Sequence, residues 1–350
     1  MFKLIKILVE SNKELILLLL FFPTVIIIVN SSFFFPIIIS IIFSYFLHNL
    51  KKILLTFGWS KNVSFFIIYF VFIAFFLLTL FILMPLVFRQ LVSLFNDLPF
   101  IIQKIKFLTD KFIIKYPSIF STEQTNLLFS NIITYVQSIG KTVISASLLS
   151  IAFTIKFIVY IFFIPIFIFF ILKDHEDMIN NFKKVMPQKS NFLKKIWQAT
   201  NKQIGNYVRG KFIEFFIITF TSYILFKMYK LSYSDLLSVG VGLSVIIPYI
   251  GTIIISIPVV LISSVQLGLS NDFFYFIVFY SVIQFLDGNL LVPILFSEAV
   301  NLHPITIIIS IIIFGSIFNL YGVVFAIPLA IVFKAIINLY LTPNEFKVDI

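Results

Sequence analysis

The sequence predicts an all-α, polytopic integral membrane protein with about eight transmembrane helices, two of them broken or re-entrant. Apolar residues make up 60% of the 350, charged residues only 12%, and the mean hydropathy is +1.10. A soluble domain of this length could not bury so much apolar surface. Apolar windows of about 20 residues, the length that crosses a bilayer, also recur along the chain.

The charges are sparse but mostly positive, and the formal net charge is +11. Because the lysines lie mainly in short connections between apolar windows, we expect them to set the orientation and to contact anionic lipid headgroups. We therefore predict a bilayer partner and no nucleic acid. The absence of cysteine excludes disulfides and thiolate metal sites, and we predict neither a metal nor a cofactor.

Residues 1–88 are predicted to form three spans. Residues 15–50 carry no Lys, Arg, Asp or Glu and are too long for one span, so we expect two helices separated at Asn30–Ser32. A third span covers 64–88 and ends at Arg89. No cleavage site follows the first apolar run, so we expect that run to remain as an anchor.

Residues 89–144 mix polar and apolar positions, which predicts an amphipathic helical insertion on the extracytoplasmic side. Asn96 and Asp97 can cap a helix that starts near Pro99, and Ser121 with Gln124 forms a plausible capping box for a second helix. We interpret the apolar stripe of that second helix as a packing or interfacial face.

A fourth span is predicted over 145–172, and a basic connection over 173–211. Nine basic residues face three acids in that connection, which the positive-inside rule places in the cytoplasm. A helical apolar face there predicts a helix that lies along the inner membrane surface. This face consists of Leu193, Ile196, Trp197, Thr200 and Ile204.

Residues 212–340 form the predicted C-terminal membrane core, and 341–350 a cytoplasmic tail. The core holds spans at 212–226 and from Phe273 onward, and two longer elements at 235–266 and 304–339, which proline and glycine interrupt. Whether these two elements cross once or fold back is left open by the sequence. Eight crossings put both termini in the cytoplasm.

The polar stretch from Asp287 to Pro304 interrupts this apolar core and is the candidate functional centre. Gln284 and Asp287 fall on one helix face together with Tyr280. An intramembrane carboxylate is a functional hypothesis by default, here a proton or monovalent-cation site. The alternative is that Asp287 and Asn289 tie neighbouring helices together by hydrogen bonds.

Three further ionisable positions have two interpretations each. Glu214 can pair with Arg209 or Lys211 as an interfacial ion pair, or contact substrate. Glu298 and His303 flank the break before the last element. His303 suits a proton relay, but a helix start before Pro304 explains it equally.

The candidate helix breaks and gates are proline and glycine positions with one tyrosine. Such breaks expose backbone groups that can coordinate an ion, or they merely bend a helix. These positions are Pro248, Tyr249, Gly251, Gly288, Pro293, Pro304, Gly322 and Pro328.

Several motifs together resemble the autoinducer-2 exporter family, also called the PerM permease family, and are most similar to its PerM-like branch. They are Tyr207–Lys211, Ile247–Gly251, Gln284 with Asp287–Pro293, Asn301–Pro304 and Ala326–Leu329, with Phe170–Asp174 earlier in the chain. Many members carry Glu in place of Asp287, and glycine in place of Asn319, which puts close helix packing there in doubt.

This resemblance implies a bacterial inner-membrane protein that exports or exchanges a small solute, with coupling to protons or sodium in some members. We therefore predict a secondary transporter of an unidentified solute, and a homo-oligomer as a further candidate partner. No nucleotide-binding, zinc-protease or hydrolase motif is present, so we predict no enzyme. The alternative function is a non-transporting scaffold in envelope maintenance.

Overall fold

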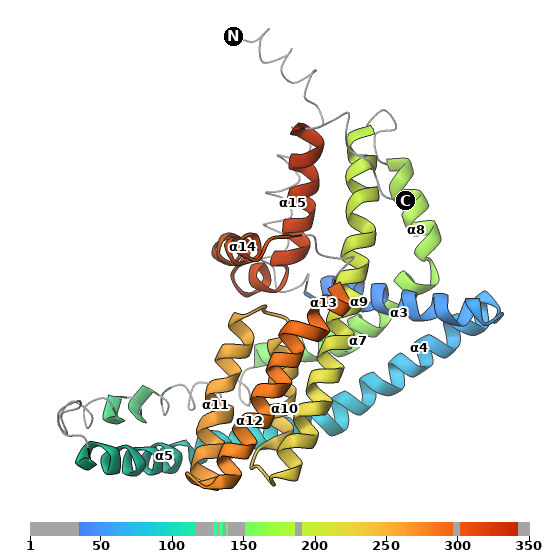
Figure 1. Ribbon diagram of the computed structural model, residues 1–350. Helices are drawn as coiled ribbons and strands as arrows, with labels where there is room; N and C mark the ends of the chain where they lie inside the picture. Colours follow the sequence, from blue (N-terminus) through green and yellow to red (C-terminus); the bar gives the residue numbers. More distant parts are fainter. Residues whose placement is uncertain are drawn as a thin grey trace. The chain divides into compact units, whose positions relative to one another are not determined.

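The computed structural model describes residues 35–115, 129–131, 133–135, 138, 151–185, 191–296 and 302–341. All regular secondary structure in these ranges is helical, without a strand, which confirms the all-α prediction (Figure 1). The predicted break at Asn30–Ser32, the capping box at Ser121 and most of the stripe after it lie outside the described residues.

The helices are α3 (Phe35–Thr56), α4 (Lys61–Leu78), α5 (Met84–Lys115), α7 (Ile151–Lys173), α8 (His175–Val185), α9 (Asn191–Met228), α10 (Ser234–Ser244), α11 (Ile250–Leu267), α12 (Asn271–Leu286), α13 (Val292–Phe296), α14 (Pro304–Val324) and α15 (Ala326–Leu341). Two short π-helical segments, η1 (Thr79–Leu83) and η2 (Asp287–Leu291), continue α4 and α12. A π-helical turn inside an α-helix marks an inserted residue and occurs often at functional sites.

Five helical runs in the described ranges are long and apolar enough to cross a membrane. They are Pro36–Thr56, Lys61–Phe107, Ile250–Leu267, Asn271–Phe296 and Pro304–Val324. A sixth is added if α7 and α8, which bend by 76° at Asp174, count as one span. The chain is therefore a multi-pass membrane protein, and the total of eight crossings stays a prediction.

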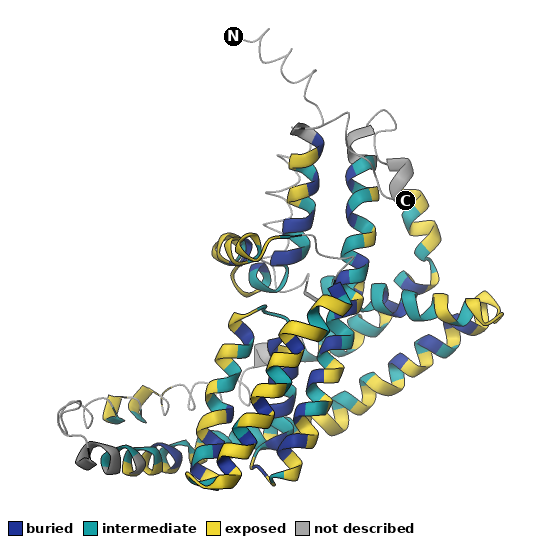
Figure 2. Ribbon diagram, viewed as in Figure 1, coloured by how far each residue is buried: buried dark blue, intermediate teal, exposed yellow. Residues whose placement is uncertain are grey.

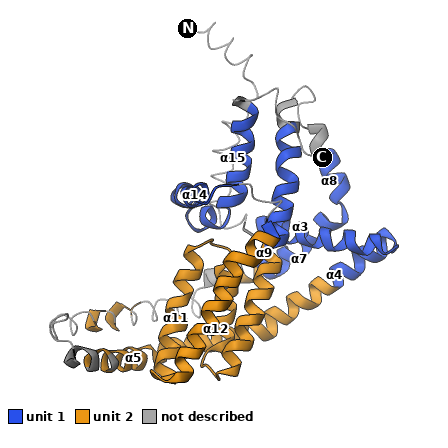
Figure 3. Ribbon diagram, in the orientation of Figure 1, with its two compact units in different colours: residues 1–70, 160–210, 295–350 blue, residues 71–159, 211–294 orange. Residues whose placement is uncertain are grey.

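The chain folds into two compact units that interleave in the sequence (Figure 3). Unit 1 comprises Met1–Phe70, Tyr160–Gly210 and Leu295–Ile350, and unit 2 comprises Val71–Val159 and Lys211–Ile294. The unit boundaries fall within α4, α7, α9 and α13. The units are defined by contacts between helices and differ from the consecutive segments that the sequence predicts. Those segments stay a prediction.

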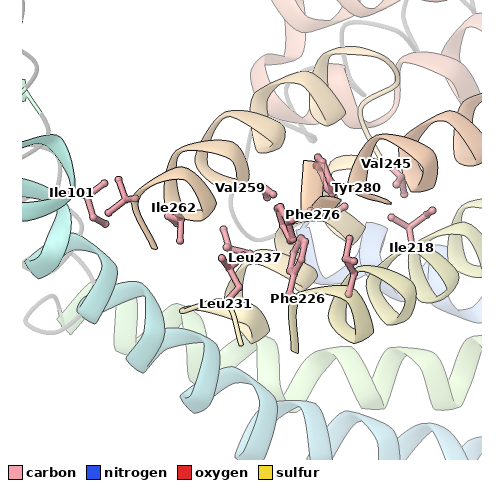
Figure 4. Close-up of a cluster of buried hydrophobic side chains, with 13 residues drawn as sticks. Ile101, Ile218, Phe226, Leu231, Leu237, Val245, Val259, Ile262, Phe276 and Tyr280 are labelled. Atoms are coloured by element: carbon pink, nitrogen blue, oxygen red, sulfur yellow. The ribbon is translucent and has the colours of Figure 1, made fainter. Parts of the chain in front are cut away.

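Unit 2 is built around a buried apolar cluster between the C-terminal half of α9 and helices α10, α11 and α12 (Figure 4). Phe226, Phe276 and Val259 are completely buried there, and Tyr280 closes one side of the cluster. The outward faces of α11 and α12 remain exposed and apolar (Figure 2), as expected for helices that face lipid. The cluster therefore fixes which faces of these helices point inward.

Helix α5 crosses the ends of α10 and α11 and is held there by polar contacts. Gln90 donates a hydrogen bond to Asp235 and accepts one from the backbone amide of Leu236, and Tyr233 donates to Asp97. Burial and the bond to Asp97 raise the pKa of Tyr233 above its ordinary range, so its hydroxyl stays protonated and donates. The polar residues of α5 thus serve as packing contacts.

In unit 1, α3 packs against the C-terminal part of α7 and the N-terminal half of α9. The Ser40 hydroxyl reaches the Ile164 carbonyl at 3.2 Å, and Tyr45 donates to Asn201. Helices α14 and α15 fold back on each other as a hairpin. Ile196 and Thr200, which the sequence placed on a membrane-surface face, are buried in this unit.

Two predicted helix boundaries are wrong. The predicted helix start near Pro99 does not exist, because α5 runs unbroken from Met84 to Lys115 with Pro99 inside it. Likewise the predicted surface helix and the span at 212–226 are one helix, α9. Charged side chains such as Arg209 are good helix formers and do not end a helix by themselves.

Both long C-terminal elements are broken, as predicted, and each folds back as a helix pair. The first breaks between Ser244 and Ile250, where Tyr249 has a φ of 62°. The second bends at Asn319, with φ 54° and ψ −136°, before α15 begins at Ala326. A Cβ on Gly322 would lie 1.7 Å from the Phe314 carbonyl oxygen, so only glycine permits this close approach.

We expect Asn319→Gly to stabilise the protein by about 1 kcal/mol, because the backbone at this position suits glycine and strains other residues. Asn319→Ala should destabilise it by about 1 to 2 kcal/mol, since alanine tolerates this conformation less well than asparagine does. Thermal unfolding of the purified protein in detergent, followed by circular dichroism, measures both changes. Equal melting temperatures for the two variants would contradict a strained backbone at Asn319.

Candidate ion-coupling site

A charged pair lies on the inward face of α9, in unit 2. The Lys211 ammonium is 2.8 Å from Glu214 Oε2, and the two side chains are 14% and 2% exposed. Their spacing of three residues places them one above the other on a helix. Glu214 thus pairs with Lys211, one of the two partners that the sequence offers for an interfacial ion pair. The pair is, however, buried within unit 2.

The connection between α10 and α11 supplies a second oxygen atom to the same lysine. Lys211 Nζ donates to the Val245 carbonyl oxygen at 2.6 Å, just beyond the last residue of α10. Because the helix stops there, this carbonyl has no amide four residues ahead in regular helical position. The break holds its shape because Gly251 lies so close to Ser244 that a Cβ would be 2.0 Å from the Ser244 carbonyl oxygen.

Asp287 is the first residue of the π-helical segment η2 and is 6% exposed. Its Oδ1 has no hydrogen-bond partner among the described residues. Asp287 interacts electrostatically with both Lys211 and Glu214, so it lies within electrostatic range of the ion pair, without a salt bridge to the ammonium. We call Lys211, Glu214 and Asp287 the charge cluster.

The neighbours of Asp287 divide between the interior and the exposed side of the helix. Tyr280 is buried and shares a 3.0 Å hydrogen bond with Ser256, and the Nε2 atom of Gln284 is buried without a partner among the described residues. Asn289 is exposed and donates to the Phe285 carbonyl of its own helix at 2.9 Å. This hydrogen bond lies within one helix and links Asn289 to no neighbouring helix, so the tie between helices stays a prediction.

Two other predicted ionisable residues, Arg209 and His303, lie in unit 1. Arg209 is exposed and belongs to unit 1. His303 is exposed and its Nδ1 accepts a 3.3 Å hydrogen bond from the Ile305 amide, which makes it the cap of α14 with Pro304 at the first turn. Glu298 lies outside the described residues.

The proposed gating positions have different structural roles. Pro248 and Tyr249 lie in the α10–α11 break, whereas Gly288 lies in η2, where an added Cβ would meet nothing within 4 Å. Pro293 lies within α13, and Pro328 in the first turn of α15, a position that tolerates proline. The α10–α11 break and η2 are therefore the irregular segments of unit 2 nearest the charge cluster.

Sequence reasoning missed that Lys211 and the Val245 carbonyl belong to this site. Lys211 was considered only as a partner for Glu214, although a lysine followed by a glutamate in a long apolar helix indicates a buried pair. The Val245 carbonyl carried no signal, because a backbone oxygen becomes a ligand only through tertiary packing. Within the described ranges no three His, Asp or Glu side chains are arranged to hold a metal ion.

The fold and the site define a class: a polytopic helical membrane protein with broken helices and a buried charge cluster. Residues 15–342 match the family described as AI-2E family transporter. The chain belongs to this family, which confirms the resemblance seen in its motifs, and its family supports a transport role.

Named relatives agree with this assignment. The chain is 36% identical over 303 residues to "Putative permease PerM" of Escherichia coli strain K12, covering 87% of this chain and 86% of the relative. It is 26% identical over 297 residues to "Putative transport protein YueF" of Bacillus subtilis strain 168, covering 83% and 80%. A "Putative transport protein" of Thermotoga maritima is 29% identical over 161 residues, 46% of each chain.

Removing one member of the buried pair should be far more costly than removing one member of an exposed pair. Glu214→Leu leaves a buried ammonium without its carboxylate and should lower the free energy of unfolding by about 3 kcal/mol. The matched control is Glu176→Leu, since Glu176 pairs with Lys61 at 3.3 Å while both side chains are more than 70% exposed. That change should cost less than about 0.5 kcal/mol.

Unfolding in mixed micelles with increasing sodium dodecyl sulfate, followed by circular dichroism, measures both variants. Similar losses for Glu214→Leu and Glu176→Leu would show that the Lys211–Glu214 pair is solvated.

Proposed function

We propose that this protein is a secondary transporter that moves a small solute across the bacterial inner membrane, with both termini in the cytoplasm. Asp287 is the group that couples this movement to a proton or a sodium ion. The observation that carries the proposal is the buried carboxylate of Asp287, with an unpartnered oxygen beside the Lys211–Glu214 pair. Intramembrane acids of this kind characteristically bind the ion that drives transport.

Charge balance gives the physical reason for coupling. With both acids ionised, the charge cluster carries two negative charges and one positive charge. An uncompensated charge away from water is costly, so a proton or monovalent cation that binds there is strongly favoured. Transport requires this ion to enter from one side and leave to the other.

The two irregular segments beside the charge cluster, η2 and the α10–α11 break, are the proposed moving parts. Discontinuous helices in other transporters expose backbone carbonyls and helix ends that bind ions near the middle of the bilayer. The family description and the printed names of the relatives support a transport function. A non-transporting scaffold would instead keep Asp287 shut off from water on both sides.

Water access to the charge cluster can be tested because the chain has no cysteine. We expect Gln284→Cys, on the same helix face as Asp287, to react with a membrane-impermeant maleimide from outside intact cells and from inside inverted vesicles. Phe279→Cys is the matched control, since Phe279 lies on the exposed apolar face of the same helix. It should react from neither side, because a thiol in lipid does not ionise.

If Gln284→Cys reacts only with a membrane-permeant maleimide, the polar cluster is packing and the scaffold function replaces the transporter.

Coupling is tested in proteoliposomes that enclose a pH-sensitive dye. We expect an inward sodium gradient, compared with choline at the same ionic strength, to drive protons out through the wild type. Asp287→Asn should reduce this movement to the leak of protein-free vesicles, whereas Asp287→Glu, which keeps a carboxyl group, should retain part of it. Asn289→Ala is the control and should match the wild type, because Asn289 is exposed and bonds its own helix.

Unchanged proton movement in Asp287→Asn would remove Asp287 from the coupling mechanism. A wild type without sodium-driven proton movement would exclude sodium–proton exchange.

A further inference from the structure

Lys211 has the surroundings of a bound cation. Its ammonium lies 2.8 Å from Glu214 Oε2 and 2.6 Å from the Val245 carbonyl oxygen, and its side chain is 14% exposed. One of these oxygens belongs to a carboxylate and the other to backbone at a helix break. Oxygen atoms of these two kinds also form the binding sites of alkali and alkaline-earth cations in proteins.

The third member of the charge cluster is not saturated by the lysine. Asp287 is 6% exposed, it interacts electrostatically with Lys211, and its Oδ1 has no hydrogen-bond partner among the described residues. One ammonium therefore contacts Glu214 and interacts electrostatically, without a salt bridge, with a second buried carboxylate, that of Asp287. The remaining negative charge attracts a second cation to the oxygen atoms that Lys211 already occupies.

The lysine side chain is flexible enough to move its ammonium away from these oxygen atoms. An ammonium group is a compact point charge on a flexible four-carbon stem, without the fixed bidentate geometry of arginine. Lys211 can therefore withdraw its charge from Glu214 and Val245 without a backbone movement. The Val245 carbonyl, in contrast, belongs to the backbone of the α10–α11 break, where Gly251 packs against Ser244.

We propose that Lys211 is a tethered cation, which occupies a monovalent-cation site formed by Glu214, Asp287 and the Val245 carbonyl and competes there with a free alkali cation. This inference rests on the proposed transport function and deepens it. A free cation enters when the Lys211 ammonium withdraws, and the ammonium returns when the cation leaves. The oxygen atoms of the site thus never face the apolar interior without a positive charge.

The test measures cation binding without transport. Wild type and Lys211→Gln are purified in detergent and melted, with circular dichroism as the readout, in NaCl, LiCl, KCl or choline chloride at equal concentration. The wild type should melt at nearly the same temperature in all four salts. Lys211→Gln has lost the internal competitor, so at least one alkali cation should raise its melting temperature by roughly 4 °C over choline.

Three controls separate cation binding from a merely structural role. Lys61→Gln makes the same change in an exposed pair and should gain no alkali-specific response. Lys211→Arg keeps a tethered cation and should behave like the wild type. Adding Asp287→Asn to Lys211→Gln should remove most of the gained response.

A folded Lys211→Gln with the same melting temperature in all four salts overturns the proposal, and Lys211 is then a structural pin of the α10–α11 break. If Lys211→Gln does not fold, the wild type is instead melted in much higher concentrations of each alkali chloride and of choline chloride. Because a free cation competes with the ammonium for the same oxygen atoms, at least one alkali cation must then raise the wild-type melting temperature over choline, and no such rise overturns the proposal.

The outcome is separable from that of the transport experiments. An alkali response in Lys211→Gln, together with a Gln284→Cys that reacts only with the membrane-permeant maleimide, would retain the cation site and reject the transporter. Proton movement that depends on Asp287, without an alkali response in Lys211→Gln, would retain the transporter and reject the tethered cation.

Discussion

The position of the Lys211 ammonium between Glu214 and the Val245 carbonyl is the interaction on which the centre of unit 2 depends. A charged or polar group in an apolar protein within a bilayer must find its partner inside the protein. Lys211 meets two such requirements at once. It neutralises a buried carboxylate, and it donates a hydrogen bond to a carbonyl that has no helical partner because α10 ends there. Removing the lysine side chain would leave the Glu214 carboxylate and the Val245 carbonyl without this partner.

The same requirement explains why the irregular segments of unit 2 lie around this lysine. Non-helical backbone at membrane depth is tolerated only where it is buried in protein or lines a wet cavity. The α10–α11 break meets this condition through Lys211 and through the close contact of Gly251 with Ser244. The η2 segment lies at Asp287, where the inserted residue of a π-helix turns a carboxylate toward the interior while Gly288 and Asn289 stay exposed.

Stability and function make opposite demands on this cluster. A pair as buried as Lys211 and Glu214 holds the fold only while both charges are present. Asp287 has an Oδ1 without a hydrogen-bond partner among the described residues, and under the proposed function the binding of an ion would relieve this cost. The apolar cluster around Phe226 and Phe276 supplies the rigid support against which such a change can occur. The charge cluster therefore lies beside a close-packed core.

The sequence by itself determined the class of the protein, its helical content and two of its breaks, those in the elements at 235–266 and 304–339. Apolar windows require membrane helices, and proline with glycine at Pro248–Gly251 and around Gly322 requires interruptions whatever the packing. It also indicated Asp287 as a candidate functional residue, because a carboxylate within an apolar run is costly unless it has a partner or a function. It did not determine where helices end, since α5 passes through Pro99 and α9 passes through Arg209 without a break.

Only the tertiary structure decided which groups meet. Lys211 and Asp287 are 76 positions apart, and no local pattern predicts that they share one cluster. Every residue has a backbone carbonyl, so the sequence does not single out that of Val245. It accepts a hydrogen bond from Lys211 only because α10 ends beside α9. The same holds for Asn289, which is two residues from Asp287 but faces away from the cluster, because η2 fixes which side of the helix is buried.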